Sequence, residues 1–127
     1  MRRMSTKEGR RARADFGLRL KDGLNLNIRF WLSKKGKIVC ASGRINLLEN
    51  IEKFGSLTKA AKSMNISYRH AWLLIDGMRK AYGRKIIKTR IGGFKGGGAE
   101  LTEEGKKLIK KFYRCRKEIL ERLRDVK

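Results

Sequence analysis

The chain has 127 residues, with 34 Lys and Arg against 12 Asp and Glu, so its formal net charge is +22 at neutral pH. This length suits one domain, and 40% hydrophobic residues can build its core. The charge would strain a compact chain unless a polyanion offset it, and nucleic acid is the commonest such partner. A membrane surface is the competing partner, but no apolar run could span a bilayer. The charged N-terminus lacks a signal-peptide core, which predicts a cytoplasmic, nucleoid-associated protein.

The N-terminal part is predicted to hold a basic arm and a β-hairpin. Residues 1–22 carry many basic and few large apolar side chains. They form either an arm that orders on a polyanion or an ordinary flexible terminus. Residues 24–32 alternate apolar and polar side chains, which predicts a half-buried strand. A turn at 33–37 and a short return strand at 37–41 follow.

Three helices are expected in the middle of the chain, over residues 43–53, over 57–64, and from Ser67 to about Tyr82. Gly55 suits a left-handed cap after the first helix, and Ser56 and Ser67 suit the N-caps of the next two. Asn65 tolerates the positive φ of a tight turn between the second and third helices. The small residues Ala60, Ala61 and Ala71 stand where those helices would cross. The apolar residues Met64 and Ile66 flank the turn. This pattern predicts a helix-turn-helix.

The segment after the third helix predicts a basic β-hairpin, or wing. Residues 85–91 are β-branched and basic, residues 92–98 contain five glycines, and residues 99–101 predict a short returning strand. Glycines let the backbone approach phosphates and offer bare N–H groups. A phosphate-binding P-loop is not expected, because Gly105-Lys106 lacks the Ser or Thr that must follow.

DNA contacts are predicted from three elements. The recognition helix and the helix before it contribute Thr58, Lys59, Ser67, Tyr68, Arg69, His70 and Trp72. The wing contributes Lys88, Arg90, Gly92, Gly93, Lys95, Gly96 and Gly97. Arg69 suits a guanine edge in the major groove. Trp72 either contacts DNA or packs under the wing.

A last helix is expected from the cap residue Thr102 to about residue 125. Its apolar residues recur at intervals of three and four, which predicts a dimer seam of Leu108, Phe112, Cys115, Ile119 and Leu123. The alternative cover is the chain's own first helix or N-terminal strand. The expected organisation is therefore an arm at 1–22, a winged helix-turn-helix with its hairpin at 23–102, and a dimerisation helix at 103–127. The fold class is mainly α with a small β wing.

The stretch 43–113 resembles the N-terminal DNA-binding domain of the molybdate-responsive ModE regulators, which is related to the LysR-type winged helix. The matching motifs are Gly55-Ser56-Leu57, Ala60-Ala61-Lys62, Ile66-Ser67-Tyr68-Arg69, Ala71-Trp72, Ile75-Asp76-Gly77-Met78, the wing from Gly92 to Ala99, and Leu101-Thr102-Glu103-Glu104-Gly105. The resemblance implies a transcription regulator that binds a pseudo-palindromic operator as a homodimer. The chain stops soon after Thr102, so the family's C-terminal oxyanion-binding domains and molybdate sensing are not expected.

The favoured function is thus sequence-specific binding of double-stranded DNA to regulate transcription. The alternative is an architectural DNA- or RNA-binding protein that uses charge without sequence readout. An enzyme is not expected, because the chain has one histidine and no nucleophile motif or paired carboxylates in an apolar context. Cys40 and Cys115 lack neighbours at metal-ligand spacing and are predicted to be small buried hydrophobes. No metal or cofactor is predicted, and the sequence identifies no effector or partner protein.

Overall fold

The computed structural model describes residues 16–93 and 96–126. They divide into two compact units. One unit holds the described residues up to Phe30 together with those from Ile119 onward, and the other holds Trp31–Glu118. Among the described residues, the second unit contains the α-helices except the end of the last one, and it positions the candidate site.

The first unit contains an antiparallel hairpin of β1 (Phe16–Arg19) and β2 (Asn25–Ile28). The rings of Phe16 and Phe30 meet edge to face with centroids 6.1 Å apart. Residues 16–19 fall within the predicted N-terminal arm, but they form a strand. The basic composition of residues 1–22 concealed a short alternation in which Phe16 and Leu18 are covered while their neighbours face solvent.

The expected strand over residues 24–32 is two strands. β2 ends at Ile28, and β3 (Leu32–Lys34) begins a second hairpin with β4 (Lys37–Cys40). The turn between β3 and β4 has positive φ at Lys35 (50°) and at Gly36 (80°). Two successive positive φ angles suit the right-handed twist of a tight hairpin. The turn and the return strand therefore lie where the sequence placed them.

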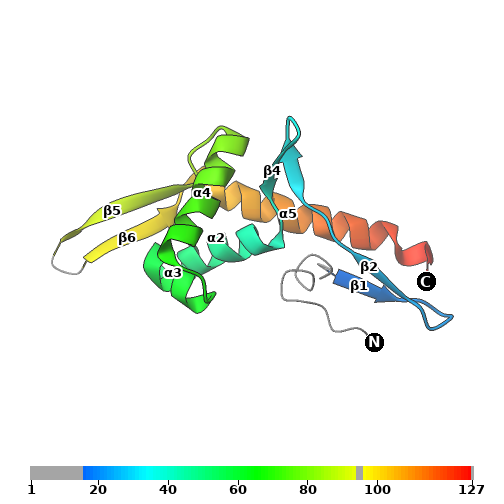
Figure 1. The fold of residues 1–127 in the computed structure, drawn as a ribbon. Coiled ribbons are helices and arrows are strands. Elements are labelled where there is room, and N and C mark those ends of the chain that lie inside the picture. The colour runs from blue at the N-terminus through cyan, green and yellow to red at the C-terminus, as the bar shows by residue number, and fades with distance from the viewer. Residues whose placement is uncertain (1–15, 94–95, 127) are drawn as a thin grey trace. The chain divides into compact units, whose positions relative to one another are not determined.

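Helices α2 (Ser42–Phe54), α3 (Leu57–Ser63) and α4 (Tyr68–Tyr82) follow in succession (Figure 1). Their ends carry the expected caps. The Ser56 Oγ accepts a hydrogen bond from the Lys59 backbone N–H at 3.1 Å, and the Ser67 Oγ accepts one from the His70 N–H at 3.0 Å. Gly55 closes α2 with a φ of 65°, and Asn65 has a φ of 59° in the turn between α3 and α4. These caps and turns fix where each helix starts and stops.

The core of the second unit lies where α2, α3 and α4 meet. The buried residues of the three helices are Ile45, Leu47, Leu48, Ile51, Leu57, Ala60, Ala61, Ala71, Ile75 and Met78. Val39 and Cys40 on β4 and Ile86 after α4 join them. Each fully buried Leu, Ile or Met contributes about 1.5–3 kcal/mol to stability. The alanines leave room for α3 and α4 to cross closely, as the sequence predicted.

Strands β5 (Ile87–Gly93) and β6 (Gly96–Leu101) pair antiparallel and extend away from the helices (Figure 1). The inner end of this hairpin is tied to the helices. The Ala99 N–H donates to the Gly55 carbonyl at 2.9 Å, and the Thr102 N–H donates to the Ile86 carbonyl at 2.9 Å. The root of the wing is therefore part of the folded core.

The last helix, α5 (Glu103–Arg122), is followed by a short 3-10 turn, η1 (Arg124–Val126). The Thr102 Oγ1 accepts from the Gly105 N–H at 3.1 Å, and Glu103 and Glu104 occupy the first turn, where the helix dipole favours acids. The Tyr113 hydroxyl donates to the Glu49 carboxylate at 2.9 Å, which links α5 to α2. In the described part of the chain, no helix combines the length and the apolar character needed to cross a bilayer.

Candidate nucleic-acid interface

Helix α4 turns one side to the core and leaves the other open. Ala71, Ile75 and Met78 form its buried side. The predicted contact residues Ser67, Tyr68, Arg69, His70 and Trp72 are all exposed. Tyr68 is 53% exposed, Trp72 is 47% exposed and Leu73 is 52% exposed. Large apolar groups left uncovered on a helix that also carries a cation mark a surface available to a partner.

Trp72 was open to two interpretations. The side chain is 47% exposed, so about half of its surface remains open to a partner. It lies one helical turn after Tyr68, so the two aromatic side chains share one face of α4.

The turn before α4 fixes the direction in which this face points. Asn65 adopts the left-handed conformation, and the next residue, Ile66, donates its N–H to the Ala61 carbonyl at 3.0 Å. The Ser63 hydroxyl donates to Asn50 Oδ1 at 3.1 Å, which ties the end of α3 to α2. The sequence analysis did not find this Asn50–Ser63 contact, because polar residues 13 positions apart give no periodic signal.

The first turn of α3 presents Thr58 and Lys59 to solvent, as expected for phosphate contacts. Lys62, which the sequence analysis did not select, is also exposed on this short helix. A cation one turn after Thr58 could have been found from helical spacing alone.

Asp76 is the one acidic residue within α4. Its carboxylate accepts from Arg79 at 2.8 Å and lies 3.0 Å from the Lys80 ammonium. The hydrogen bonds from Arg79 and Lys80 hold the pKa of Asp76 below its ordinary value. Asp76 is therefore ionised at neutral pH, and neighbouring cations offset the charge that it would present to a polyanion.

The wing presents Lys88 and Arg90 as exposed cations on β5, and Ile91 beside them is fully exposed. A Cβ atom built on Gly98 would lie 2.5 Å from Arg90 Nη2, so glycine leaves the space that the Arg90 side chain occupies. Glu100 stands directly opposite Lys88 in the register. The sequence analysis did not foresee this cross-strand pair because it depends on the register of the two strands.

The glycines of the wing lie at its outer end. Gly92 and Gly93 end β5, Gly96 and Gly97 begin β6, and Gly93 pairs with Gly96. Lys95, the remaining wing residue of the prediction, lies outside the described residues.

The predicted dimer seam needs a correction at two positions. Leu108 is 4% exposed and Phe112 is 3% exposed within the single chain. They pack in the chain's own core and leave almost no surface for a partner helix, as in the alternative left open. Cys115, Ile119 and Leu123 are half-buried, so only the later part of the seam retains exposed apolar surface.

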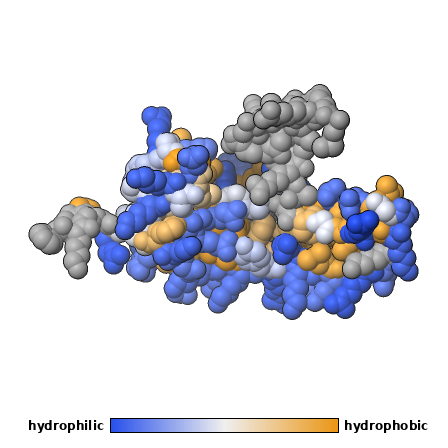
Figure 2. All heavy atoms as spheres, turned by 90° about the horizontal axis from the view of Figure 1, so that it is seen from below, coloured by the Kyte–Doolittle hydropathy of each residue, from blue (hydrophilic) through white to orange (hydrophobic). Residues whose placement is uncertain are grey.

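The exposed cations of α3, α4 and the wing suit polyanion binding. Within residues 16–93 and 96–126, no group of three His, Cys, Asp or Glu side chains could hold a metal ion. Figure 2 shows that hydrophilic residues cover most of the visible face, with hydrophobic residues in smaller patches.

The fold class is a winged helix-turn-helix, as the sequence predicted. It is defined by a helix-turn-helix, a β-hairpin wing and a following helix.

Curated relatives confirm the resemblance to the ModE regulators. "Molybdenum transport protein ModE" of Azotobacter vinelandii is 41% identical over 66 residues, which are 52% of this chain and 24% of that protein. "Transcriptional regulator ModE" of Haemophilus influenzae is 33% identical over 82 residues, 65% of this chain and 30% of that protein. "DNA-binding transcriptional dual regulator ModE" of Escherichia coli K12 is 34% identical over 89 residues, 70% of this chain and 34% of that protein. The chain thus spans about a quarter to a third of the length of these relatives. No protein-family model matches it.

Two solved structures are similar to part of the chain. A CbnR DBD–DNA complex has a TM-score of 0.48 at 18% identity and covers 65% of this chain and 88% of its own. ArgP from Mycobacterium tuberculosis has a TM-score of 0.46 at 14% identity and covers 65% of this chain and 29% of its own.

Proposed function

We propose that the chain is a transcriptional regulator that binds specific sequences in double-stranded DNA. The carrying observation is the face of α4, where Tyr68, Arg69 and Trp72 stand exposed beside the capped helix N-terminus. Residues at this end of a recognition helix contact base edges in the major groove. The relatives from Haemophilus influenzae and Escherichia coli, which are named transcriptional regulators, support this proposal.

Each contact has a distinct chemical role. The Arg69 guanidinium is matched to the O6 and N7 atoms of guanine, which it can bind in bidentate fashion. Tyr68 and Trp72 offer apolar surface to thymine methyl groups and sugars. Thr58 and Lys59 at the start of α3 would hold phosphates, and so would the wing residues Lys88, Arg90 and Lys95. Phosphate contacts position the protein, while the α4 contacts read the sequence.

The protein would act as a homodimer on a pseudo-palindromic operator. The half-buried Cys115, Ile119 and Leu123 at the end of the α5 seam support this assembly. A two-fold dimer places two recognition helices about 34 Å apart, which is one turn of DNA. Its place of action would be the cytoplasm, at the nucleoid, where the chromosomal DNA lies.

The alternative is an architectural protein that uses charge alone, and the net charge of +22 supports both functions. Binding selection from random DNA separates the two functions. A specific regulator returns a palindromic motif, and its preference persists at about 0.2 M salt, where non-specific affinity has fallen steeply. A selection that returned no motif would assign the architectural function instead.

The sharpest variant is Arg69→Ala. Loss of one bidentate base contact should weaken operator binding by about 1–3 kcal/mol and relax the motif at one position per half-site. Lys37→Ala is the matched control because it removes an equal charge from β4, which packs at the other end of α4. If the Arg69→Ala variant kept the same motif and affinity, α4 would not be the recognition helix.

A further inference from the structure

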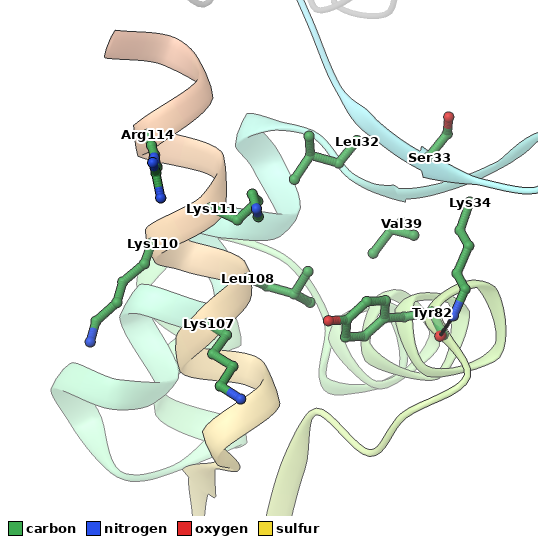
Figure 3. Close-up of a pocket in the computed structure, with 10 residues that line it drawn as sticks. All are labelled: Leu32, Ser33, Lys34, Val39, Tyr82, Lys107, Leu108, Lys110, Lys111 and Arg114. Atoms are coloured by element: carbon green, nitrogen blue, oxygen red, sulfur yellow. Dashed lines mark hydrogen bonds between the residues drawn. The ribbon is translucent and has the colours of Figure 1, made fainter. Parts of the chain in front are cut away.

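A hollow of about 490 Å³ lies between α5 and the β3–β4 hairpin, where the last turn of α4 also reaches (Figure 3). Four side chains with apolar surface line it (Figure 3): Leu32 and Tyr82 are half-buried, whereas Val39 and Leu108 are almost fully buried. Every lining residue belongs to the unit Trp31–Glu118. Its volume falls within the range of small-molecule sites, which is roughly 300–1,000 Å³.

The charged part of the lining is entirely basic and consists of Lys34, Lys107, Lys110, Lys111 and Arg114. Two of these cations are already engaged. The Lys34 ammonium donates to the Tyr82 carbonyl at 3.0 Å, and the Lys107 ammonium lies 3.8 Å from Glu104. Within the described parts of the chain, Lys110, Lys111 and Arg114 form no ion pair.

The carboxylate that pairs with Lys107 does not neutralise these three cations. Glu104 lies outside the lining and is shared by the Tyr82 hydroxyl at 3.3 Å, Arg84 at 3.6 Å and Lys107 at 3.8 Å. Burial, and then the charge of Glu104, raise the pKa of Tyr82, so its hydroxyl remains protonated at neutral pH. The wall along α5 therefore carries uncompensated positive charge beside apolar surface.

We propose that this hollow binds a small organic anion, a carboxylate or sulfonate carried on an apolar body. The apolar walls would take the body out of water, while Lys110, Lys111 and Arg114 would hold the acidic group at the rim. An inorganic oxyanion has no apolar body, so the apolar walls would remain in contact with water. A DNA strand presents phosphates without an apolar body that could enter the hollow.

The site is separate from the proposed DNA contacts. Tyr82 is the last residue of α4, whereas the proposed base contacts begin at Ser67 just before its first turn. A helix of 15 residues is about 22 Å long. This inference therefore goes beyond the proposed function and can fail without affecting it.

The probe for the full chain is 8-anilinonaphthalene-1-sulfonate, a fluorescent amphipathic anion, titrated at about 0.2 M salt to screen diffuse attraction. We expect saturable binding of one dye per chain. N-phenyl-1-naphthylamine, which lacks the sulfonate, should bind about tenfold more weakly, and inorganic sulfate should not displace the dye. The dye should also raise the melting temperature, which excludes binding to a loosened state.

The test variant is Lys110→Gln with Lys111→Gln, and the matched control is Lys106→Gln with Lys117→Gln. All four lysines are exposed on α5, but only the first two line the hollow. The test pair should weaken dye binding by about tenfold, and the control pair by less than about twofold. Equal losses in both pairs, equal binding of the neutral analogue, or absence of saturation would each overturn the proposal. Displacement by a short DNA duplex, with DNA affinity lost only in the test pair, would assign this surface to DNA.

Discussion

Gly105 occupies a position where the backbone leaves no room for a side chain. A Cβ atom there would lie 2.5 Å from the Ile86 carbonyl oxygen, which already accepts hydrogen bonds from the Thr102 N–H and hydroxyl. The first turn of α5 can approach the strand that begins the wing only because this residue is glycine. The resemblance to the ModE regulators included Gly105, but its physical reason could be found only in the packing of α5 against residue 86.

Replacing Gly105 by alanine should therefore destabilise the fold although alanine is the better helix former. We expect the clash to lower the free energy of unfolding by about 1–3 kcal/mol, measured by urea denaturation. Gly43→Ala is the control, because Gly43 lies in the first turn of α2 with no atom within 4 Å of the added Cβ. That variant should gain up to about 1 kcal/mol. A Gly105→Ala protein as stable as Gly43→Ala would contradict the close approach.

The two cysteines differ in their surroundings, although the sequence predicted both as small buried hydrophobes. Cys40 is fully buried, whereas Cys115 is half-buried. Burial raises the pKa of the Cys40 thiol from 9.0 to about 11, and Arg44 offsets only part of this. The prediction therefore holds fully for Cys40 and only in part for Cys115.

Iodoacetamide at mildly alkaline pH should consequently label Cys115 and spare Cys40 in the folded chain, as mass spectrometry of peptides would show. In denaturant both should react.

The raised pKa of Cys40 also has a consequence for the stability of the fold. Between pH 9.0 and about 11 the folded chain retains a thiol proton that the unfolded chain loses, so stability should fall as pH rises through this range. In the Cys40→Ala variant, stability should fall less steeply over this pH range. An identical fall in the variant and the wild type would show that Cys40 is not its cause.

At the scale of elements, caps and turns were predictable, but the pairing of strands was not. Helix ends were predictable within a residue or two because capping and turn residues satisfy local backbone requirements. These residues are Gly55, Ser56, Asn65 and Ser67. The β1–β2 hairpin was missed because a four-residue strand in a basic segment has too short a pattern. The hollow beside α5 was not predictable either, because it depends on how distant segments pack.

The wing should contribute affinity without sequence preference. Arg90 is exposed on β5, and phosphate contacts release counterions from DNA. Arg90→Ala should weaken binding to all sequences alike and reduce the salt slope of the binding constant by about 0.9. Filter binding over a salt series measures the slope, with Lys37→Ala as the charge-matched control. A selective loss of operator binding would instead give Arg90 a role in base readout.

At the scale of the whole molecule, the net charge and the α5 seam both predict assembly with partners. The charge of +22 attracts a polyanion over long distances. Burial of Leu108 and Phe112 in the chain's own core shortens the seam available to a second copy. Cys115, Ile119 and Leu123 are the residues on which the proposed homodimer now depends.

Ile119→Glu should break that homodimer, because it would place an unpaired charge in an apolar interface. Sedimentation at micromolar concentration should then give a monomer, while Lys117→Glu on the exposed side of α5 remains dimeric. Operator affinity should fall with the dimer, whereas non-specific affinity should change little. A wild-type chain that sediments as a monomer under these conditions would rule out the proposed assembly.

The anchored root of the wing has a practical consequence for protein engineering. The Ala99–Gly55 and Thr102–Ile86 hydrogen bonds hold its inner end, while Lys88, Arg90 and Ile91 farther out are covered by nothing in the core. Foreign hairpins could be grafted between Arg90 and Gly98 as interchangeable cassettes, each altering DNA affinity while the domain keeps its melting temperature.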